Sequence, residues 1–309
     1  RSINPPLPSH AHEVEVLDEI LGRALKHRHS GPIPQLKLWL SNQTSQEVDN
    51  LLATLGLGAD SEFVVMGVGG GHSERQWNIH GFLLVAAELL RHGTRTVLLG
   101  CPKDAERFAG EQSRMNQLAI ANLIEKSSLP VAAGITRRAL AYIGDDTSIM
   151  HFAAASQTPI VEISCHPVAC DLDHPWSPMR FGPWRTPCRV LQPLARAEGE
   201  TSRTIDQIAP DEVVTAFYHL TNPSEVGLEG TLDNRFDSPR IWINHSKTAR
   251  EYPFAIFWDR DGTLIHHIDY LHDPEKVKIR DGVLDCFEGT HGEGYLHFLF
   301  SNQSGVARG

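Results

Sequence analysis

The chain has 309 residues and a mass of 34.3 kDa, with 41% hydrophobic and 21% charged residues, a composition that excludes disordered, collagen-like and coiled-coil proteins. At about 150 residues per domain, this length predicts two domains. The 28 Lys and Arg residues against 38 Asp and Glu give a formal charge of -10, which is the wrong sign for non-specific binding of nucleic acid through its phosphates.

The sequence shows no targeting signal. No apolar run approaches the roughly 18 residues of a membrane span, and the N-terminus lacks a signal peptide. The five cysteines are odd in number and contain no C-x-x-C pair, which argues against a disulfide framework and a zinc ribbon. We therefore expect reduced thiols and a cytoplasmic location. The chain begins with Arg1 and stops inside a motif described below, so we expect both ends to be cut.

Residues 1–60 contain helical patterns over 13–26 and 45–55 and form no obvious domain alone. From residue 62, short β-branched apolar runs alternate with amphipathic stretches, which predicts a parallel sheet covered on both faces. The expected strands cover residues 63–66, 96–99, 139–143 and 159–163, and the expected helices cover residues 79–91, 103–118, 129–138, 147–155 and 210–220.

Residues 164–193, rich in Pro, His and Trp, predict a long ordered loop beside a site. A second α/β unit begins with a buried strand at 253–258, followed by a helix at 283–289 and a strand at 296–300. The predicted organisation is a remnant of a preceding domain with a connector (1–60), an α/β domain (61–220), a linker (221–252) and a truncated α/β domain (253–309).

The most specific motif is Asp259-Arg260-Asp261-Gly262-Thr263 after one expected strand, paired with Ser301-Asn302-Gln303 after the next. Ligands bind beyond the carboxyl ends of parallel strands, so the two clusters should meet at one crevice. Two carboxylates at i and i+2 can serve as nucleophile and as general acid and base, and their oxygens suit Mg²⁺. Ser301 would hold a phosphate oxygen. The alternative is a plain Asp-Gly turn and a Ser-Asn helix cap.

These motifs, together with Tyr270–Pro274, Asp281-Gly282-Val283 and Ser304–Gly309, resemble the start of a haloacid-dehalogenase-type phosphatase. The most similar group is that of the D-glycero-D-manno-heptose 1,7-bisphosphate phosphatases and histidinol-phosphatases. The resemblance implies Asp259 as nucleophile, Asp261 as acid and base, and Mg²⁺ held by the Asp259 carboxylate and the Asp261 backbone carbonyl. Ser301 and Asn302 are the candidate phosphate-binding residues. The resemblance also implies a later lysine, a later acidic metal ligand and a zinc loop, so we expect no turnover by this fragment alone.

The second constellation runs from Gly144 to Ala155, from a strand end into a helix. A helix N-terminus with a hydroxyl residue suits a diphosphate, although Asp146 or Thr147 fits a simple N-cap equally well. A glycine loop after an earlier strand, residues 67–71, precedes Arg75, whose cation can reach a phosphate or a ribose. Trp77 fits the core better than stacking on a base.

Together these segments resemble the donor-binding half of glycosyltransferase family nine, the ADP-heptose:lipopolysaccharide heptosyltransferases. The matching pieces are residues 67–77, 95–102, 122–129, 144–155, 158–161 and 181–184. The resemblance implies a Rossmann-like GT-B C-terminal domain in which the donor diphosphate and sugar lie against Asp146, Thr147, Ser148 and His151.

In this resemblance Arg75 stands where the family usually carries a lysine on the nucleotide. Ser148-Ile149 replaces the usual Gly-Pro, and Glu125 replaces a glycine. The family's N-terminal acceptor domain carries its catalytic aspartate, and residues 1–60 are too few to supply it, so we expect the fragment to bind donor without transferring sugar.

A weaker candidate is the cluster of His166, Cys170, Asp173 and His174 in the Pro-rich loop. Zinc accepts these ligand types, but no standard spacing is matched, and a plain polar loop is the favoured interpretation.

The two resemblances lead to one hypothesis, a bacterial bifunctional chain. An inverting, metal-free heptosyl transfer from ADP-heptose would use the helix dipole and Arg75 on the departing diphosphate, and a fused Mg²⁺-dependent phosphatase would act on a sugar phosphate. The expected acceptor is lipid-linked or a glycan at the inner membrane face, and no nucleic acid partner is expected. One alternative is that only the phosphatase is physiological and the transferase half is a nucleotide-sugar-binding module. Another is a non-catalytic scaffold that senses nucleotide sugars.

Overall fold

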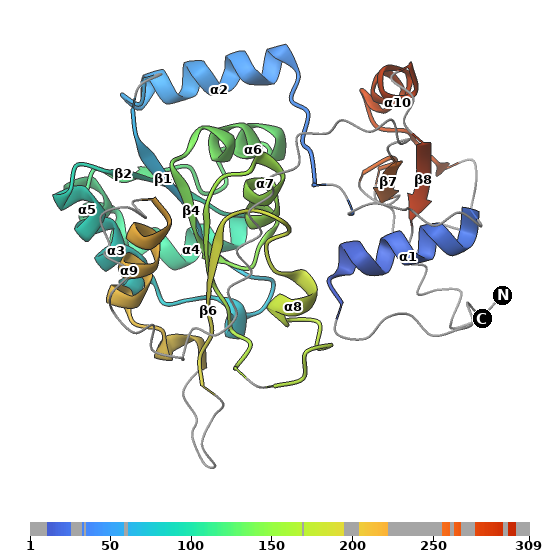
Figure 1. Cartoon of the computed structure of the whole chain (residues 1–309). Coiled ribbons are helices and arrows are strands. Elements are labelled where there is room, and N and C mark those ends of the chain that lie inside the picture. The colour runs from blue at the N-terminus through green and yellow to red at the C-terminus, as the bar shows by residue number, and fades with distance from the viewer. Residues whose placement is uncertain are drawn as a thin grey trace. The chain divides into compact units, whose positions relative to one another are not determined.

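The computed structural model describes residues 11–25, 33, 35–58, 61–168, 170–194, 204–221, 255–259, 263–266, 276–292 and 296–300 (Figure 1). The chain divides into two compact units, Arg1–Asn244 and His245–Gly309, and each is described here by itself.

The first unit is built on a six-stranded sheet in the order β3-β2-β1-β4-β5-β6, in which every neighbouring pair is parallel. Its strands are β1 (Phe63–Gly67), β2 (Arg95–Leu99), β3 (Ala121–Asn122), β4 (Ala141–Asp145), β5 (Ile160–Ile163) and β6 (Cys188–Leu191). β1 and β4 are buried at every position, as expected for strands with helices on both faces. The predicted α/β class is therefore confirmed.

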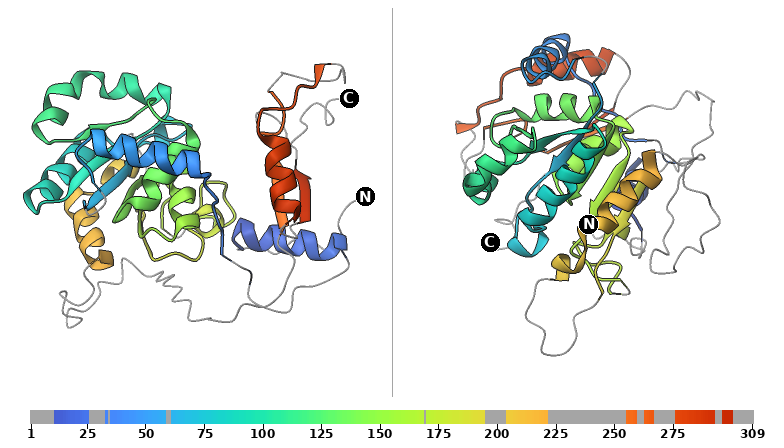
Figure 2. Two further views of the ribbon diagram at one scale, coloured as in Figure 1. Left: turned by 90° about the horizontal axis from the view of Figure 1, so that it is seen from above. Right: turned by 90° about the vertical axis from the view of Figure 1, so that its left-hand side faces the viewer.

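Helices lie on both sides of this sheet (Figures 1 and 2). On one face α3 (Ile79–Arg91) and α9 (Pro210–Thr221) share a core that includes Phe82 and Phe217. On the other face α2 (Asn42–Thr54), α6 (Leu129–Arg138) and α7 (Ser148–Ser156) share a second core. The remaining helices of this unit are α1 (Glu13–Leu25), η1 (Ser73–Arg75), α4 (Pro102–Phe108), η2 (Ala109–Glu111), α5 (Gln112–Gln117), α8 (Pro178–Phe181) and η3 (Thr204–Gln207).

Helix α2 packs on α6 and belongs to the sheet structure. Its Val48 and Leu52 are buried in the same core as Ile135 of α6, and a β-carbon on Gly134 would lie 2.6 Å from the Val48 side chain. Residues 42–54, which the sequence analysis assigned to the connector, therefore help to cover one face of the sheet, while the domain limits themselves stay predictions.

The local structure differs from the sequence prediction in two places. The helix expected over 103–118 is interrupted by the 3-10 turn η2, which contains Gly110, a residue of low helix propensity. The segment 164–193 was predicted as a loop throughout, and this was wrong because it contains the short helix α8 and the edge strand β6. β6 lacks a clear apolar pattern because only its two end residues are buried.

The second unit contains the parallel strands β7 (Ala255–Asp259) and β8 (Leu296–Phe300) and the helix α10 (Val283–Gly292). The expected strand–helix–strand order is confirmed. In neither unit does the described part of the chain contain a helix that is long and apolar enough to cross a membrane.

Candidate functional site

The candidate site lies where β1, β4 and β5 end, at the carboxyl edge of the sheet. Gly67, Gly144 and Glu162 occupy one row across these three strands. A β-carbon on Gly144 would lie 2.2 Å from the Gly67 carbonyl oxygen, so the two strand ends approach too closely for any larger residue at position 144. The loops that follow these strands are thereby brought together.

The glycine loop after β1 is held tightly. Gly69 has a φ of 111°, and a β-carbon there would lie 2.1 Å from the Asp104 carboxylate. The Asp104 carboxylate in turn accepts a hydrogen bond of 2.8 Å from the Cys101 backbone N–H at the start of α4. Position 69 therefore requires glycine both for its conformation and for space.

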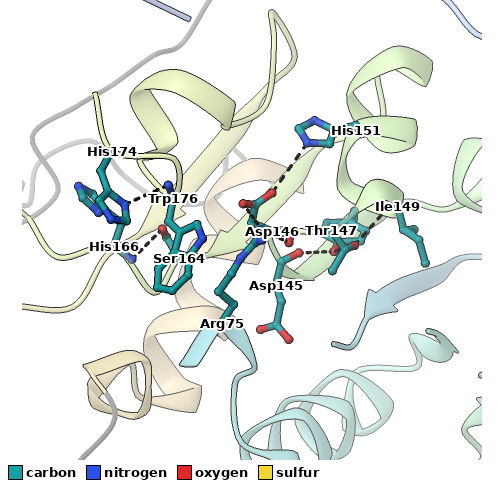
Figure 3. A network of polar contacts seen from close by, with 11 residues as sticks. Arg75, Asp145, Asp146, Thr147, Ile149, His151, Ser164, His166, His174 and Trp176 are labelled. Atoms are coloured by element: carbon teal, nitrogen blue, oxygen red, sulfur yellow. Dashed lines mark hydrogen bonds and ion pairs between the residues drawn. The ribbon is translucent and has the colours of Figure 1, made fainter. Parts of the chain in front are cut away.

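Arg75 and Asp146, which the sequence analysis placed in the donor site, are joined directly (Figure 3). Arg75 Nη2 donates to the Asp146 carbonyl oxygen at 2.8 Å and pairs with Asp146 Oδ2 at 2.5 Å. From α7, His151 Nε2 lies 3.8 Å from Asp146 Oδ1. The Asp146 carboxylate thus stands between a guanidinium and an imidazole, and these residues come from three separate segments.

Thr147 is the N-cap of α7, because its side-chain oxygen accepts the Ile149 N–H at 3.2 Å. The prediction that Thr147 is a helix N-cap is therefore confirmed. An N-cap at Thr147 is compatible with a diphosphate site at the same place. The first N–H groups of a helix have no partner within the helix, and Ser148, the first residue of α7, is exposed. An anion at this end of α7 would also benefit from the helix dipole.

Sequence reasoning missed Asp145, which is fully buried at the end of β4. Its Oδ1 accepts the Trp77 N–H at 2.9 Å and its Oδ2 accepts the Gly69 N–H at 3.0 Å, so one carboxyl holds both the glycine loop and the segment after η1 against the end of β4. Asp145 and Asp146 are adjacent acids, and strand alternation could have predicted that their side chains point in different directions.

Burial changes the titration of two groups here. It raises the pKa of Asp145 to about 7, against the lowering effect of the hydrogen bonds from Trp77 and Gly69. It lowers the pKa of His151 below its ordinary value, and Arg75 adds to that effect while Asp146 opposes it. The surroundings of His151 therefore favour the neutral imidazole.

Trp77 is a core residue, as predicted. It is fully buried, its ring meets Phe82 edge to face at 5.1 Å, and its Nε1 donates to the Ile208 carbonyl at 3.1 Å. It leaves no ring face for a nucleotide base.

Two residues depart from the pattern described in the sequence analysis, Glu125 and Ser148, and the structure shows the local conformation at each. Glu125 has a φ of 58°, in the left-handed region that favours glycine, so a glycine at this position would be less strained. Ser148 lies at the exposed start of α7, where a hydroxyl is sterically acceptable.

The loop after β5 holds His166 and His174, whose rings stack at 5.3 Å, and Trp176, which lies beside His174 (Figure 3). No group of three or more His, Cys, Asp or Glu residues in the described part of the chain is arranged to hold a metal ion.

In the second unit, Asp259 is the last residue of β7 and pairs in register with Phe300, the last residue of β8. The two predicted clusters therefore follow neighbouring parallel strands at one edge. Asp261, Ser301 and Asn302 lie outside the described residues, as does the side chain of Asp259, so their predicted roles stay predictions.

Comparison with known proteins agrees with this architecture. Residues 24–165 match the sequence profile of glycosyltransferase family 9 (heptosyltransferase). The glycosyltransferase family 9 structure from Veillonella parvula has a TM-score of 0.59 and 20% identity over 69% of this chain and 61% of that one. The ADP-heptose lps heptosyltransferase II of E. coli has a TM-score of 0.51 and 21% identity, covering 64% and 56%.

A short segment also matches curated phosphatases. The D-glycero-beta-D-manno-heptose-1,7-bisphosphate 7-phosphatase of Haemophilus influenzae is 47% identical over 55 residues, 18% of this chain and 30% of the relative. The enzyme of the same name from Escherichia coli K12 is 40% identical over 61 residues, 20% and 31% of the two chains. The chain thus spans about a third of the length of these relatives. It combines a unit of GT-B-like fold, part of which matches the family 9 heptosyltransferase profile, with a segment similar to heptose bisphosphate phosphatases.

Proposed function

We propose that the first unit binds a nucleoside-diphosphate sugar, ADP-heptose, as the donor of an inverting heptosyl transfer in cell-surface glycan synthesis. The match of residues 24–165 to the family 9 profile supports this proposal. The observation that carries this proposal is the meeting of Arg75 with Asp146 at the N-terminus of α7. A cation and a helix N-terminus at one point are a site for a diphosphate.

In this proposal each residue has a defined task. The N–H groups at the start of α7 and the guanidinium of Arg75 hold the diphosphate, and both stabilise the negative charge that develops as the sugar leaves. Thr147 and Ser148 line the phosphates, and His151 and Asp146 face the sugar. No metal is needed for this step, and the acceptor is proposed to be lipid-linked or a glycan.

Calorimetric titration of the 309-residue chain with ADP-heptose, ADP-glucose, UDP-glucose and a GDP-sugar tests the proposal. We expect selective binding of ADP-heptose that Asp146→Ala abolishes. Thr147→Ala should weaken binding, and Thr147→Ser should restore it because the hydroxyl cap returns. Thr54→Ala removes an exposed hydroxyl that bonds to Leu51 in α2 and serves as the matched control. Absence of binding by any sugar nucleotide would contradict the donor site.

A second activity is proposed for residues 253–309, where the phosphatase-like motifs lie. It is supported by the short phosphatase matches and by the parallel pairing that sets Asp259 beside the end of β8. Asp259 would attack the phosphate of a sugar bisphosphate, Asp261 would protonate the leaving oxygen, and Ser301 and Asn302 would bind phosphate oxygens. Oxygen ligands of this kind suit Mg²⁺, which would neutralise the phosphate charge.

Phosphate release from heptose 1,7-bisphosphate, with and without Mg²⁺ and with Asp259→Asn as control, separates the alternatives. Donor binding together with heptosyl transfer and phosphate release supports the bifunctional proposal. Phosphate release alone supports the alternative in which the family 9 domain is a binding module, and binding without either reaction supports a nucleotide-sugar sensor.

A further inference from the structure

Glu162 is a buried acid that the proposed mechanism does not use. It lies on β5 between Gly144 of β4 and Val190 of β6, and its side chain is 1% exposed. Its strand neighbour two residues earlier, Ile160, packs in the core under α7, so strand alternation places Glu162 on the same face. The adjacent Gly144 has no side chain to cover the carboxyl.

Two buried polar atoms at this place are unsatisfied. Glu162 Oε2 and Arg75 Nε have no hydrogen-bond partner among the residues that the structure describes. Arg75 directs its Nη2 to Asp146, so its charge is shared with one carboxylate already. An ionised Glu162 would be a second carboxylate acting on the same guanidinium, in a place where ions are poorly solvated.

The titratable groups around Glu162 come from every neighbouring segment. They are Tyr142 of β4, Asp146 between β4 and α7, Arg75 after β1 and Cys165 after β5. Burial raises the pKa of Glu162 well above its ordinary value, Asp146 adds to the rise, and Arg75 and Ser164 oppose it. The surroundings therefore favour the neutral acid.

We propose that Glu162 is a proton-linked positioning residue of the donor site, which in its neutral form leaves the charge of Arg75 available to a nucleoside diphosphate. This inference rests on the proposed donor site. When Glu162 loses its proton, Arg75 is shared between two carboxylates and the bound diphosphate meets an added negative charge. Diphosphate affinity therefore falls as the pH rises through the titration of Glu162.

The test compares ADP binding by the 309-residue wild-type chain and Glu162→Gln, which fixes a neutral side chain of the same shape. The ratio of the wild-type Kd to the variant Kd, measured between about pH 6 and 9.5, should rise by up to about tenfold per pH unit where Glu162 titrates. Because ADP itself titrates in the same way in both experiments, its ionisation does not change this ratio. Glu106→Gln, the same substitution at an exposed position on α4, should give a constant ratio.

The outcomes separate the two proposals. If both proteins bind ADP and their ratio stays constant with pH, the role of Glu162 is refuted while the donor site stands. If the wild-type chain binds ADP at no pH, the donor site itself fails, and the role of Glu162 with it.

If Glu162→Gln does not fold, calorimetry of the wild-type chain in two buffers of different ionisation enthalpy counts the protons taken up with ADP. We expect uptake above about pH 8, where Asp145 and His151 have already lost their protons and where burial still keeps Cys165 protonated, since it raises the pKa of that thiol to about 11. Zero uptake across the range would refute the proposal.

Discussion

Replacing Asp145 by asparagine tests which of two opposing effects controls the pKa of this buried carboxyl, burial or hydrogen bonding. Two backbone N–H groups stabilise its ionised form, whereas complete burial disfavours it, and burial prevails because it raises the pKa of Asp145 from 3.8 to about 7. A difference of about 3 pKa units corresponds to roughly 4 kcal/mol. Since the folded state holds the proton more tightly, this contribution is fully present below about pH 4 and is lost as the pH rises to about 7.

Asparagine does not titrate, so the variant lacks this pH dependence. Its amide group also faces one of the two N–H donors that Asp145 now accepts, which costs about 1–3 kcal/mol at every pH. We therefore expect Asp145→Asn to be less stable than the wild type at pH 5. The difference should shrink by roughly 3 kcal/mol between pH 5 and pH 8, and its sign can reverse.

Urea denaturation of both proteins at pH 5, 6, 7 and 8, followed by tryptophan fluorescence, measures this difference. Asp211→Asn, at an exposed position in the first turn of α9, controls for the loss of one carboxylate. If the wild type instead gains stability over the variant as the pH rises, the two N–H bonds outweigh burial and the reasoning is refuted.

Three further predictions follow from the same site. Arg75→Gln removes a charge-assisted hydrogen bond worth about 1.5–3 kcal/mol, so ADP affinity measured by calorimetry should fall about 10- to 150-fold; an unchanged Kd would exclude contact with the diphosphate. Gly69→Ala should lower the free energy of unfolding by at least about 1–3 kcal/mol, whereas Gly71→Ala, with open space around its β-carbon, should change it little; equal effects would contradict the close approach to position 69. In NMR titrations the midpoint of His151 should lie below its ordinary value, and Asp146→Asn should lower it further because the carboxylate favours the charged ring; a rise would show that Asp146 does not act on this imidazole.

The sequence predicted most of the fold because its signals were local. The predicted ends of β1, β2, β4, β5, α3 and α6 agree with the observed ends to within about two residues. These elements are marked in the sequence by β-branched runs or by amphipathic stretches whose apolar period is unbroken. β3 has only two residues and β6 is buried only at its ends, so neither shows a period. Both strands exist because the edges of a sheet are completed by tertiary pairing, which a single sequence does not display.

The candidate site was predicted in part for a similar reason. Arg75 and Asp146 stand out because one follows a glycine loop and the other precedes a helix, and parallel strand topology brings such segments together. Asp145 and Glu162 were missed. Their roles depend on burial and on contacts across 68 or more residues of sequence, such as Trp77 to Asp145, and no local pattern reports these.

The charge balance of the site connects these observations. Three carboxyl groups lie near the ends of β4 and β5, at a place proposed to bind a dianion. Arg75 pairs with Asp146 and acts on Glu162, whereas the charges that act on Asp145 are those of Arg107 and Asp104. If all three were ionised, the local field would repel a diphosphate. Burial reduces this repulsion because it favours the neutral forms of Asp145 and Glu162. Asp146 then remains as the carboxylate that pairs with Arg75 and holds it in position. Every one of these equilibria moves in the same direction with pH, since each proton lost adds a negative charge near the phosphates. A donor site of this composition should therefore bind a diphosphate more tightly on the acidic side of each titration, and the alkaline arm of its binding profile should be steeper than one ionisation alone would produce.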